Sequence, residues 1–222
     1  MTRSIVVAVF AAVLLACTPI FSGAVMQAYP LHSAAGNDDV AAITQLLSGG
    51  AETDARDSSG ATALLVATRA NKVRAAQTLI AAGADVNAKD NISDSAYLYA
   101  GARGHLEILK LTLAHGADLA STNRYGGTAL IPAAERGHVQ TVRTLIEAGV
   151  DVDHVNNLGW TALLEAIILG SGGEQHQQIV DALLKAQANP NLADREGVSP
   201  LAHARSHGYR EIENRLRAAG GR

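Results

Sequence analysis

Apolar residues recur along most of this chain at a fixed distance from short turns that contain glycine. Pairs of aliphatic residues, such as Leu79-Ile80 and Leu145-Ile146, precede these turns in register. The turns are 33 residues apart, and they begin at Gly50, Gly83, Gly116 and Gly149. Self-similarity at a fixed period of this length predicts a repeat architecture.

A second short motif, Thr-Ala-Leu-Leu and its variants, lies upstream of each aliphatic pair. Its copies are residues 29–32, 62–65, 95–98, 128–131, 161–164 and 199–202. They divide the chain into six units, at about 25–57, 58–90, 91–123, 124–156, 157–194 and 195–222. Each unit is expected to hold two helices of about 8–10 residues and an extended turn. Helices this short are marginal in water, so each unit must stack on its neighbours.

The aliphatic residues of these helices make up the expected core. It comprises Leu31, Ile43, Leu46, Leu47, Leu64, Ala67, Leu79, Ile80, Leu109, Leu113, Leu130, Ala133, Val142, Leu145, Ile146, Leu163, Val180, Leu183, Leu184, Leu201 and Leu216. The last predicted helix, residues 210–217, is much more polar than its counterparts. That composition suits the end of an array, where the outer face meets water.

Several motifs match a known family. Gly83-Ala84-Asp85-Val86-Asn87, Gly104-His105-Leu106-Glu107-Ile108 and Gly137-His138-Val139 resemble the ankyrin repeat. The resemblance covers residues 25–222 and implies an all-α ankyrin-repeat solenoid of helix-turn-helix units with short β-hairpin-like turns. One departure concerns the histidine of the family's Thr-Pro-Leu-His motif, which only His32 supplies. Apolar packing must therefore replace most of the family's Thr–His hydrogen bonds.

Residues 1–24 differ from the repeats and predict export. Arg3 precedes an uncharged apolar run, Ile5 to Ala16, which has the length of a secretory signal core and is short for a membrane span. Cleavage after Ala24 is one route. The other is a lipoprotein signal, residues 1–16, with lipidation of Cys17. An uncleaved anchor is the third alternative. We expect a periplasmic protein, either free or tethered to the membrane through Cys17.

Composition excludes several function classes. Charged residues are 18% of the chain and the net charge is −3, so no basic excess favours a nucleic-acid partner. With one cysteine, the chain can form neither an intramolecular disulfide nor a cysteine-based zinc site. We expect a monomer without cofactors that contacts a membrane only through its signal segment or a lipid anchor.

No catalytic constellation is found in the sequence, and we expect no enzyme. His203 and His207 are four residues apart, but no carboxylate or cysteine completes a metal-ligand set at a convincing spacing. Unit five carries five extra residues around positions 170–176. This insertion leaves one alternative function, the capture of a small ligand or a metal by its loop through His176 and Glu174.

The ankyrin resemblance implies a non-catalytic protein-interaction module whose partner binds the concave face, formed by the turn tips and the first helices. Tip and first-helix positions vary from unit to unit while their flanks repeat. The expected partner-binding residues are Arg69, Asn91, Ile92, Arg103, Arg124, Tyr125, Arg136, Asn157, Leu158, Trp160 and Arg195. The sequence does not identify the partner, which is one or more proteins.

The centre of this face is expected in units three to five, because arginine and aromatic side chains gather there and are enriched at binding hot spots. The residues are Arg103, Arg124, Tyr125, Arg136 and Trp160. Glu165 is unusual in its first helix, and it either pairs with Arg136 or faces the groove. Pro132 is expected to bend the first helix of unit four unless it lies in the first turn.

Overall fold

The computed structural model describes residues 29–222, which form twelve α-helices. The predicted signal peptide and Cys17 lie outside these residues. The helices are α1 (Pro30–Gly36), α2 (Val40–Ser48), α3 (Ala63–Arg69), α4 (Val73–Ala81), α5 (Ala96–Arg103), α6 (Leu106–Ala114), α7 (Leu130–Glu135), α8 (Val139–Glu147), α9 (Ala162–Ile168), α10 (Glu174–Lys185), α11 (Pro200–Ser206) and α12 (Arg210–Ala218). The predicted all-α solenoid is confirmed. Five of the six first helices are shorter than expected, with six or seven residues, whereas α5 has eight.

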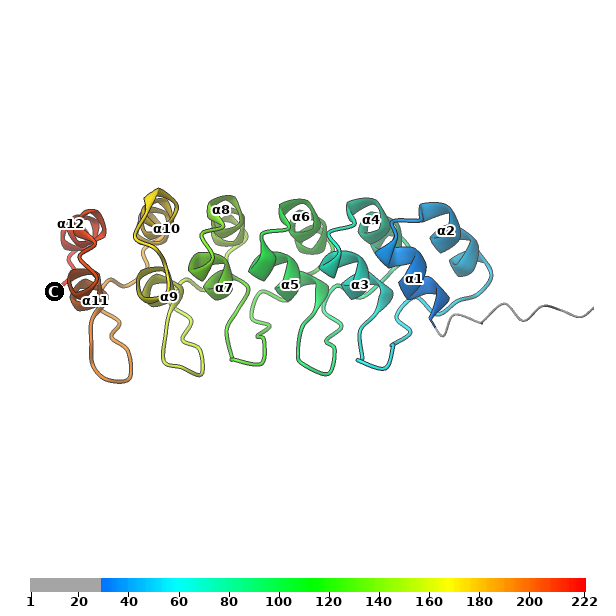
Figure 1. The fold of residues 1–222 in the computed structure, drawn as a ribbon, viewed down its shortest axis with the longest axis horizontal. Helices are drawn as coiled ribbons and strands as arrows, with labels where there is room; N and C mark the ends of the chain where they lie inside the picture. Colours follow the sequence, from blue (N-terminus) through cyan, green and yellow to red (C-terminus); the bar gives the residue numbers. More distant parts are fainter. Residues whose placement is uncertain (1–28) are drawn as a thin grey trace, which may run out of the picture.

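The helices lie in two rows that run the length of an elongated molecule (Figure 1). The first helices of the units (α1, α3, α5, α7, α9 and α11) contact one another in one row, and the second helices do so in the other. Loops extend from the row of first helices, on the side away from the second helices (Figure 1). None of these twelve helices is long and apolar enough to span a membrane.

The hydrophobic core runs between the two rows. Most of the residues expected in it are buried, including Ile43, Leu109 and Leu216. Five are only partly buried, namely Leu46, Leu47, Leu113, Ile146 and Leu184. All five come from the repeated residue pairs of the second helices. Because adjacent residues on a helix point about 100° apart, Leu113, Ile146 and Leu184 turn toward the outer surface while the residue before each is buried. In the first unit both Leu46 and Leu47 are partly buried.

Four of the first helices begin with the same cap. The side-chain oxygens of Thr62, Ser95, Thr161 and Ser199 accept hydrogen bonds from the backbone N–H three residues later, at 3.2–3.3 Å. Each cap satisfies one of the backbone donors that a helix start leaves unpaired. The small hydroxyl residue of the repeated motif therefore fixes where each of these helices begins.

The loops end in tight turns, which we call tips two to six after the unit that each one opens. They comprise residues 57–61, 90–94, 123–127, 156–160 and 194–198. In each tip an aspartate or asparagine closes the turn with its own side chain. In tip two, Asp57 Oδ1 accepts hydrogen bonds from the N–H groups of Ser59 and Ala61, at 2.8 and 3.0 Å. An isolated antiparallel bridge joins Arg56 and Thr62 beside this hairpin-like turn.

Consecutive tips also contact one another, through a glycine and the residue that faces it. Gly60 of tip two has a φ of +78°, and a Cβ there would collide with Asn91 of tip three. The Asn91 N–H also donates to the Ser59 carbonyl, at 3.0 Å. Gly126 faces Asn157 in the same way, and Gly159 faces Arg195. These contacts hold the tips in line along the array.

The insertion of unit five lies between α9 and α10 and is held by its neighbours. His176 is buried, and its Nε2 lies 2.9 Å from the Glu135 carbonyl oxygen of unit four. His105 makes the matching contact in unit three, where its Nδ1 lies 2.9 Å from the Thr68 carbonyl oxygen. The Tyr209 hydroxyl donates to the Gly170 carbonyl at 2.9 Å. The insertion thus supplies a histidine to a contact between units that the repeat already uses.

Candidate functional site

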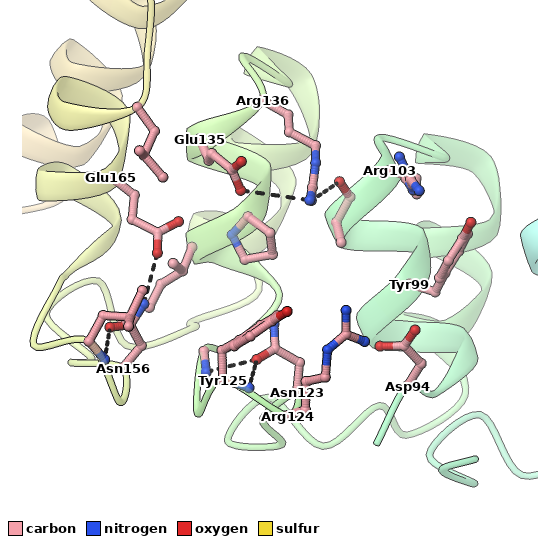
Figure 2. A pocket seen from close by; sticks show the side chains of 16 residues that line it. Asp94, Tyr99, Arg103, Asn123, Arg124, Tyr125, Glu135, Arg136, Asn156 and Glu165 are labelled. Atoms are coloured by element: carbon pink, nitrogen blue, oxygen red, sulfur yellow. Dashed lines mark hydrogen bonds and ion pairs between the residues drawn. The ribbon is translucent and has the colours of Figure 1, made fainter. Parts of the chain in front are cut away.

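A cavity of about 390 Å³ opens at the middle of the array, between the tips and the first helices of units three to five (Figure 2). Its walls come from tips three to five and from helices α5, α7 and α9. It is lined by Asp94, Tyr99, Ala102, Arg103, Asn123, Arg124, Tyr125, Gly127, Ile131, Pro132, Glu135, Arg136, Asn156, Leu158, Glu165 and Leu169. We call this cavity the central groove.

Five of the predicted partner-binding residues line the central groove. Four belong to the predicted binding centre, namely Arg103, Arg124, Tyr125 and Arg136, and the fifth is Leu158. Tyr125 and Leu158 are about half exposed, at 53% and 49%. Trp160, the remaining member of the predicted centre, is partly buried and does not line the groove. Its backbone closes tip five through hydrogen bonds with Asn156.

The other predicted residues serve contacts within the array. Asn91 and Asn157 face the glycines of the preceding tips, and Arg195 donates to the Asn157 carbonyl across the same kind of junction. Arg69 forms an ion pair with the buried Asp90. Positions that vary from unit to unit in the sequence therefore include residues that connect neighbouring units. Ile92, at 48% exposed, lies on tip three outside the groove lining.

Sequence reasoning missed Tyr99 as a site residue. The Tyr99 ring lies between two guanidinium groups, with the Cζ atoms of Arg69 and Arg103 at 5.8 and 5.6 Å from its centre. Tyr99, Pro132 and Glu165 occupy the same position of three consecutive units, and all three line the groove. The sequence could have indicated Tyr99, because it shares its repeat position with Pro132 and Glu165, which sequence reasoning did single out.

The junction between tips three and four departs from the pattern of its neighbours. Ser93 stands where tips two, four and five have glycine, and it keeps a left-handed backbone with a φ of +65°. Arg124 occupies the position that Asn91 and Asn157 hold elsewhere. Within residues 29–222, no backbone hydrogen bond joins tip three to tip four, whereas Asn157 N–H donates to the Tyr125 carbonyl at the next junction, at 2.9 Å.

Arg124 is directed into the groove (Figure 2). Its guanidinium carbon lies 4.7 Å from the centre of the Tyr125 ring, and the group points toward Asp94. Burial raises the pKa of Asp94, and repulsion by Asp90 adds to this effect, while Arg124, Arg69 and Arg103 oppose it. Within residues 29–222, neither Arg103 nor Arg124 has a carboxylate oxygen within 4.0 Å.

Glu165 faces the groove and does not pair with Arg136. Asn156 donates from its side-chain amide to Glu165 Oε1 at 2.8 Å, and Glu165 is 6% exposed. Arg136 donates instead to the Ala102 carbonyl at 2.9 Å and lies 3.7 Å from Glu135. Burial, followed by repulsion from Glu135, raises the pKa of Glu165 to about 7, although the hydrogen bond from Asn156 and the charge of Arg136 act in the opposite direction.

Helix α7 begins differently from the other first helices because of Pro132. Pro132 lies in the first turn of α7, as the alternative expectation stated. Proline has no N–H to donate to the Thr128 carbonyl, and the Ile131 N–H takes that acceptor, at 3.3 Å. The Thr128 hydroxyl, which would otherwise cap the helix, is buried and has no hydrogen-bond partner among the described residues.

The predicted alternative, ligand capture by the insertion loop through His176, is not supported. One ring nitrogen of His176 is occupied by the Glu135 carbonyl, and the other lies 3.2 Å from the Ser171 hydroxyl. Across residues 29–222, no group of three or more histidine, cysteine, aspartate or glutamate side chains is placed to hold a metal ion. His203 is paired with Asp194, at 2.7 Å.

The fold and its groove define a solenoid of helical hairpins with an open, mixed-charge surface at its centre. A family model for ankyrin repeats in three copies matches residues 11–90 and 97–194. The chain therefore belongs to the ankyrin repeat family. Repeats of this family generally mediate protein–protein interactions.

Solved structures agree with this assignment. An ankyrin repeat domain from Acinetobacter baumannii AYE (ABAYE2397) is 71% identical, with a TM-score of 0.86 over 87% of this chain and 99% of that one. The ankyrin repeat protein EF0377 is 41% identical, with a TM-score of 0.82 over 85% of this chain and 96% of that one. The ankyrin repeat domain of Bcl-3 is 28% identical, with a TM-score of 0.78 over 87% and 86% of the two chains.

One curated relative is YahD of Escherichia coli (strain K12), which is named as an ankyrin repeat protein. It is 48% identical over 56 residues, or 25% of this chain. The match spans only 28% of the length of YahD. It supports the repeat assignment and gives no basis for transferring a function.

Proposed function

We propose that this chain is an exported, non-catalytic interaction module of the periplasm that holds a partner protein in the central groove. The observation that carries the proposal is the convergence of non-repeating side chains on one cavity. Arg103 comes from α5, whereas Arg124 and Tyr125 come from tip four, yet all three open onto the same space of about 390 Å³. Arginine and aromatic residues at the centre of a contact surface are typical of binding hot spots.

Exposed apolar side chains support a protein partner in particular. Tyr125, Leu158 and Leu169 line the groove and are each about half exposed, at 53%, 49% and 51%. Apolar residues grouped beside arginines on a concave surface favour a partner that buries both kinds of group. The groove residues described here offer ion pairing, hydrogen bonding and apolar contact, which are the components of such an interface.

The export part of the proposal rests on the sequence of residues 1–24. Two mature forms follow from it, one that begins after Ala24 and one that begins at a lipidated Cys17. Intact-mass measurement of protein purified from the cell envelope distinguishes the two forms. A mass that corresponds to the complete, unmodified chain would contradict both cleavage routes.

The binding part is tested by cross-linking and affinity capture from cell envelopes. The Tyr125→Ala/Leu158→Ala variant is compared with wild type and with Val155→Ala. Val155 is a matched control because it is 49% exposed, stands next to tip five and does not line the groove. We expect one protein that wild type and the control capture and that the double variant loses. Each variant must keep the thermal unfolding curve of wild type. Equal capture by all three proteins would contradict binding in the groove.

A further inference from the structure

We propose that the segment of the partner that occupies the central groove is an extended stretch with apolar residues on both sides of an acidic side chain. The acidic side chain lies between Arg103 and Arg124. This inference rests on the proposed function and specifies its ligand. Two features of the structure support it: a pair of arginines without carboxylate partners and a row of exposed apolar tip residues.

The charges of the groove divide into paired and unpaired groups. Arg69 is paired with Asp90, and Arg136 has Glu135 and the Ala102 carbonyl. Arg103 and Arg124, by contrast, contact aromatic rings and have no carboxylate within 4.0 Å among the described residues. Arg124 points toward Asp94 (Figure 2), and Asp94 already lies 3.9 Å from Arg69. A carboxylate supplied by a partner would therefore meet two free guanidinium groups.

Guanidinium and carboxylate groups are complementary in shape as well as in charge. A guanidinium offers planar, paired N–H donors that match the two oxygens of a carboxylate. Arg103 comes from the end of α5, and Arg124 comes from tip four, so the two approach the same space from different sides (Figure 2). An acidic side chain entering between them would be held by two separate elements of the array.

The apolar residues of the tips indicate what lies on either side of this carboxylate. Ile92, Tyr125 and Leu158 occupy the same position in tips three, four and five, and they are 48%, 53% and 49% exposed. The outer tips carry Ser59 and Glu196 at this position. The apolar row is thus confined to the three units that form the groove. It extends to both sides of the arginine pair.

This arrangement favours an acidic residue inside a segment over a free carboxyl terminus. A chain that ended at Arg103 and Arg124 would leave Ile92 or Leu158 without contact. Neighbouring helices pack about 8–10 Å apart, and an extended chain advances about 3.3 Å per residue, so each unit spans about three residues of the partner. The apolar residues of the segment are therefore expected about three positions apart, with the acidic residue between them.

The test uses a displayed library of random peptides about twelve residues long, a length that covers three units at about three residues each. The library is selected on the purified protein. We expect the enriched peptides to carry aspartate or glutamate between apolar residues. Their affinity should fall about tenfold or more for the Arg103→Gln/Arg124→Gln variant. Arg143→Gln is the matched control because Arg143 is exposed on α8, outside the groove.

A second measurement keeps the inference separate from protein stability. In a double-mutant cycle, replacement of the acidic peptide residue by glutamine should weaken binding to wild type and change binding to the double-arginine variant little. The inference is overturned if enriched peptides lack an acidic residue or bind both proteins equally well. It is also overturned if the groove proves to bind a second copy of this chain, seen as concentration-dependent association that the double-arginine variant loses.

These outcomes are distinct from failure of the proposed function. Peptides that lose binding to Tyr125→Ala/Leu158→Ala, yet show no dependence on an acidic residue, would leave the groove as a binding site and reject the acidic segment. Peptides that bind wild type and both double variants equally would reject the groove itself.

Discussion

The tip junctions on either side of the central groove differ from the junction at its centre. At the side junctions a glycine of one tip receives Asn91, Asn157 or Arg195 of the next, and the tips are connected by hydrogen bonds. At the centre Ser93 replaces the glycine, and Arg124, which holds the corresponding position in the next tip, points into the groove. Where one side chain links two units it is not free to bind a partner.

Units three and four, which flank the central junction, also contain buried polar groups that lack hydrogen-bond partners. Among residues 29–222, the buried side-chain atoms without a hydrogen-bond partner are Tyr97 Oη of unit three and Thr128 Oγ1 of unit four. The corresponding caps in units two and five are intact, at Thr62 and Thr161. Local structural rules are commonly broken at functional sites. The groove thus coincides with the part of the array where contacts of the repeat are incomplete.

The largest expected effect comes from breaking a side junction. Gly60→Ala places a Cβ against Asn91 at a φ of +78°, and we expect it to lower the free energy of unfolding by about 2–3 kcal/mol. Gly197→Ala is the control, because Gly197 has the same φ and a Cβ added there would have no neighbouring atom within 4 Å. It should cost about 1 kcal/mol. Urea unfolding measures both, and equal losses would show that the tip contact contributes nothing.

An effect of similar size concerns the pH dependence of stability at Glu165. Its pKa is about 7 in the folded chain and 4.5 when unperturbed, so the folded state binds this proton more tightly. The contribution of Glu165 is therefore most favourable below pH 4.5 and is lost as the pH rises through 7. The expected loss is about 3 kcal/mol, because one pKa unit corresponds to about 1.4 kcal/mol.

Glu165→Gln isolates this contribution, since its amide oxygen still accepts the hydrogen bond from Asn156. The variant should be more stable than wild type at pH 8 and similar to it at low pH. Unfolding free energies measured across this range provide the check. Parallel pH profiles for the two proteins would show that Glu165 titrates normally.

Two smaller effects on stability, of opposite sign to each other, are expected at the helix caps. Thr128→Val replaces a buried hydroxyl without a partner by a methyl group and should stabilise the chain by about 1 kcal/mol. Thr161→Val removes a working cap at the same position of unit five and should destabilise it by about 1 kcal/mol. Thermal unfolding of both variants tests this difference in sign. A loss of stability in both would mean that the Thr128 hydroxyl is satisfied in solution.

The smallest effect is expected from a double substitution that gives the central junction the residues of a side junction. Ser93→Gly/Arg124→Asn removes a left-handed serine and introduces the glycine–asparagine pair found at two of the other three junctions. We expect a gain of about 0.5 kcal/mol, because relief of backbone strain exceeds the entropy that glycine adds to the unfolded chain. Partner binding should weaken at the same time. A variant that gains stability and keeps full binding would separate the open junction from function.

The sequence alone predicted the repeat period, the two-helix unit, the six copies of its motif and the location of most core residues. These are local properties, since the spacing of apolar residues and turn formers dictates which short segments become helices and where they end. Variation among tip and first-helix positions also directed attention to Arg103, Arg124, Tyr125 and Arg136. Leu158 was found in the same way.

Only the tertiary structure separated binding positions from linking ones. One position of the tips is occupied by Asn91, Arg124, Asn157 and Arg195. The sequence does not distinguish which of these side chains is available to bind a partner. What distinguishes Arg124 is the serine one unit earlier, because the Cβ of Ser93 fills the position that glycine leaves open to the next tip at the other junctions. The same holds for His176, which contacts the Glu135 carbonyl 41 residues away. Such contacts between units depend on how the units stack, and no local pattern records them.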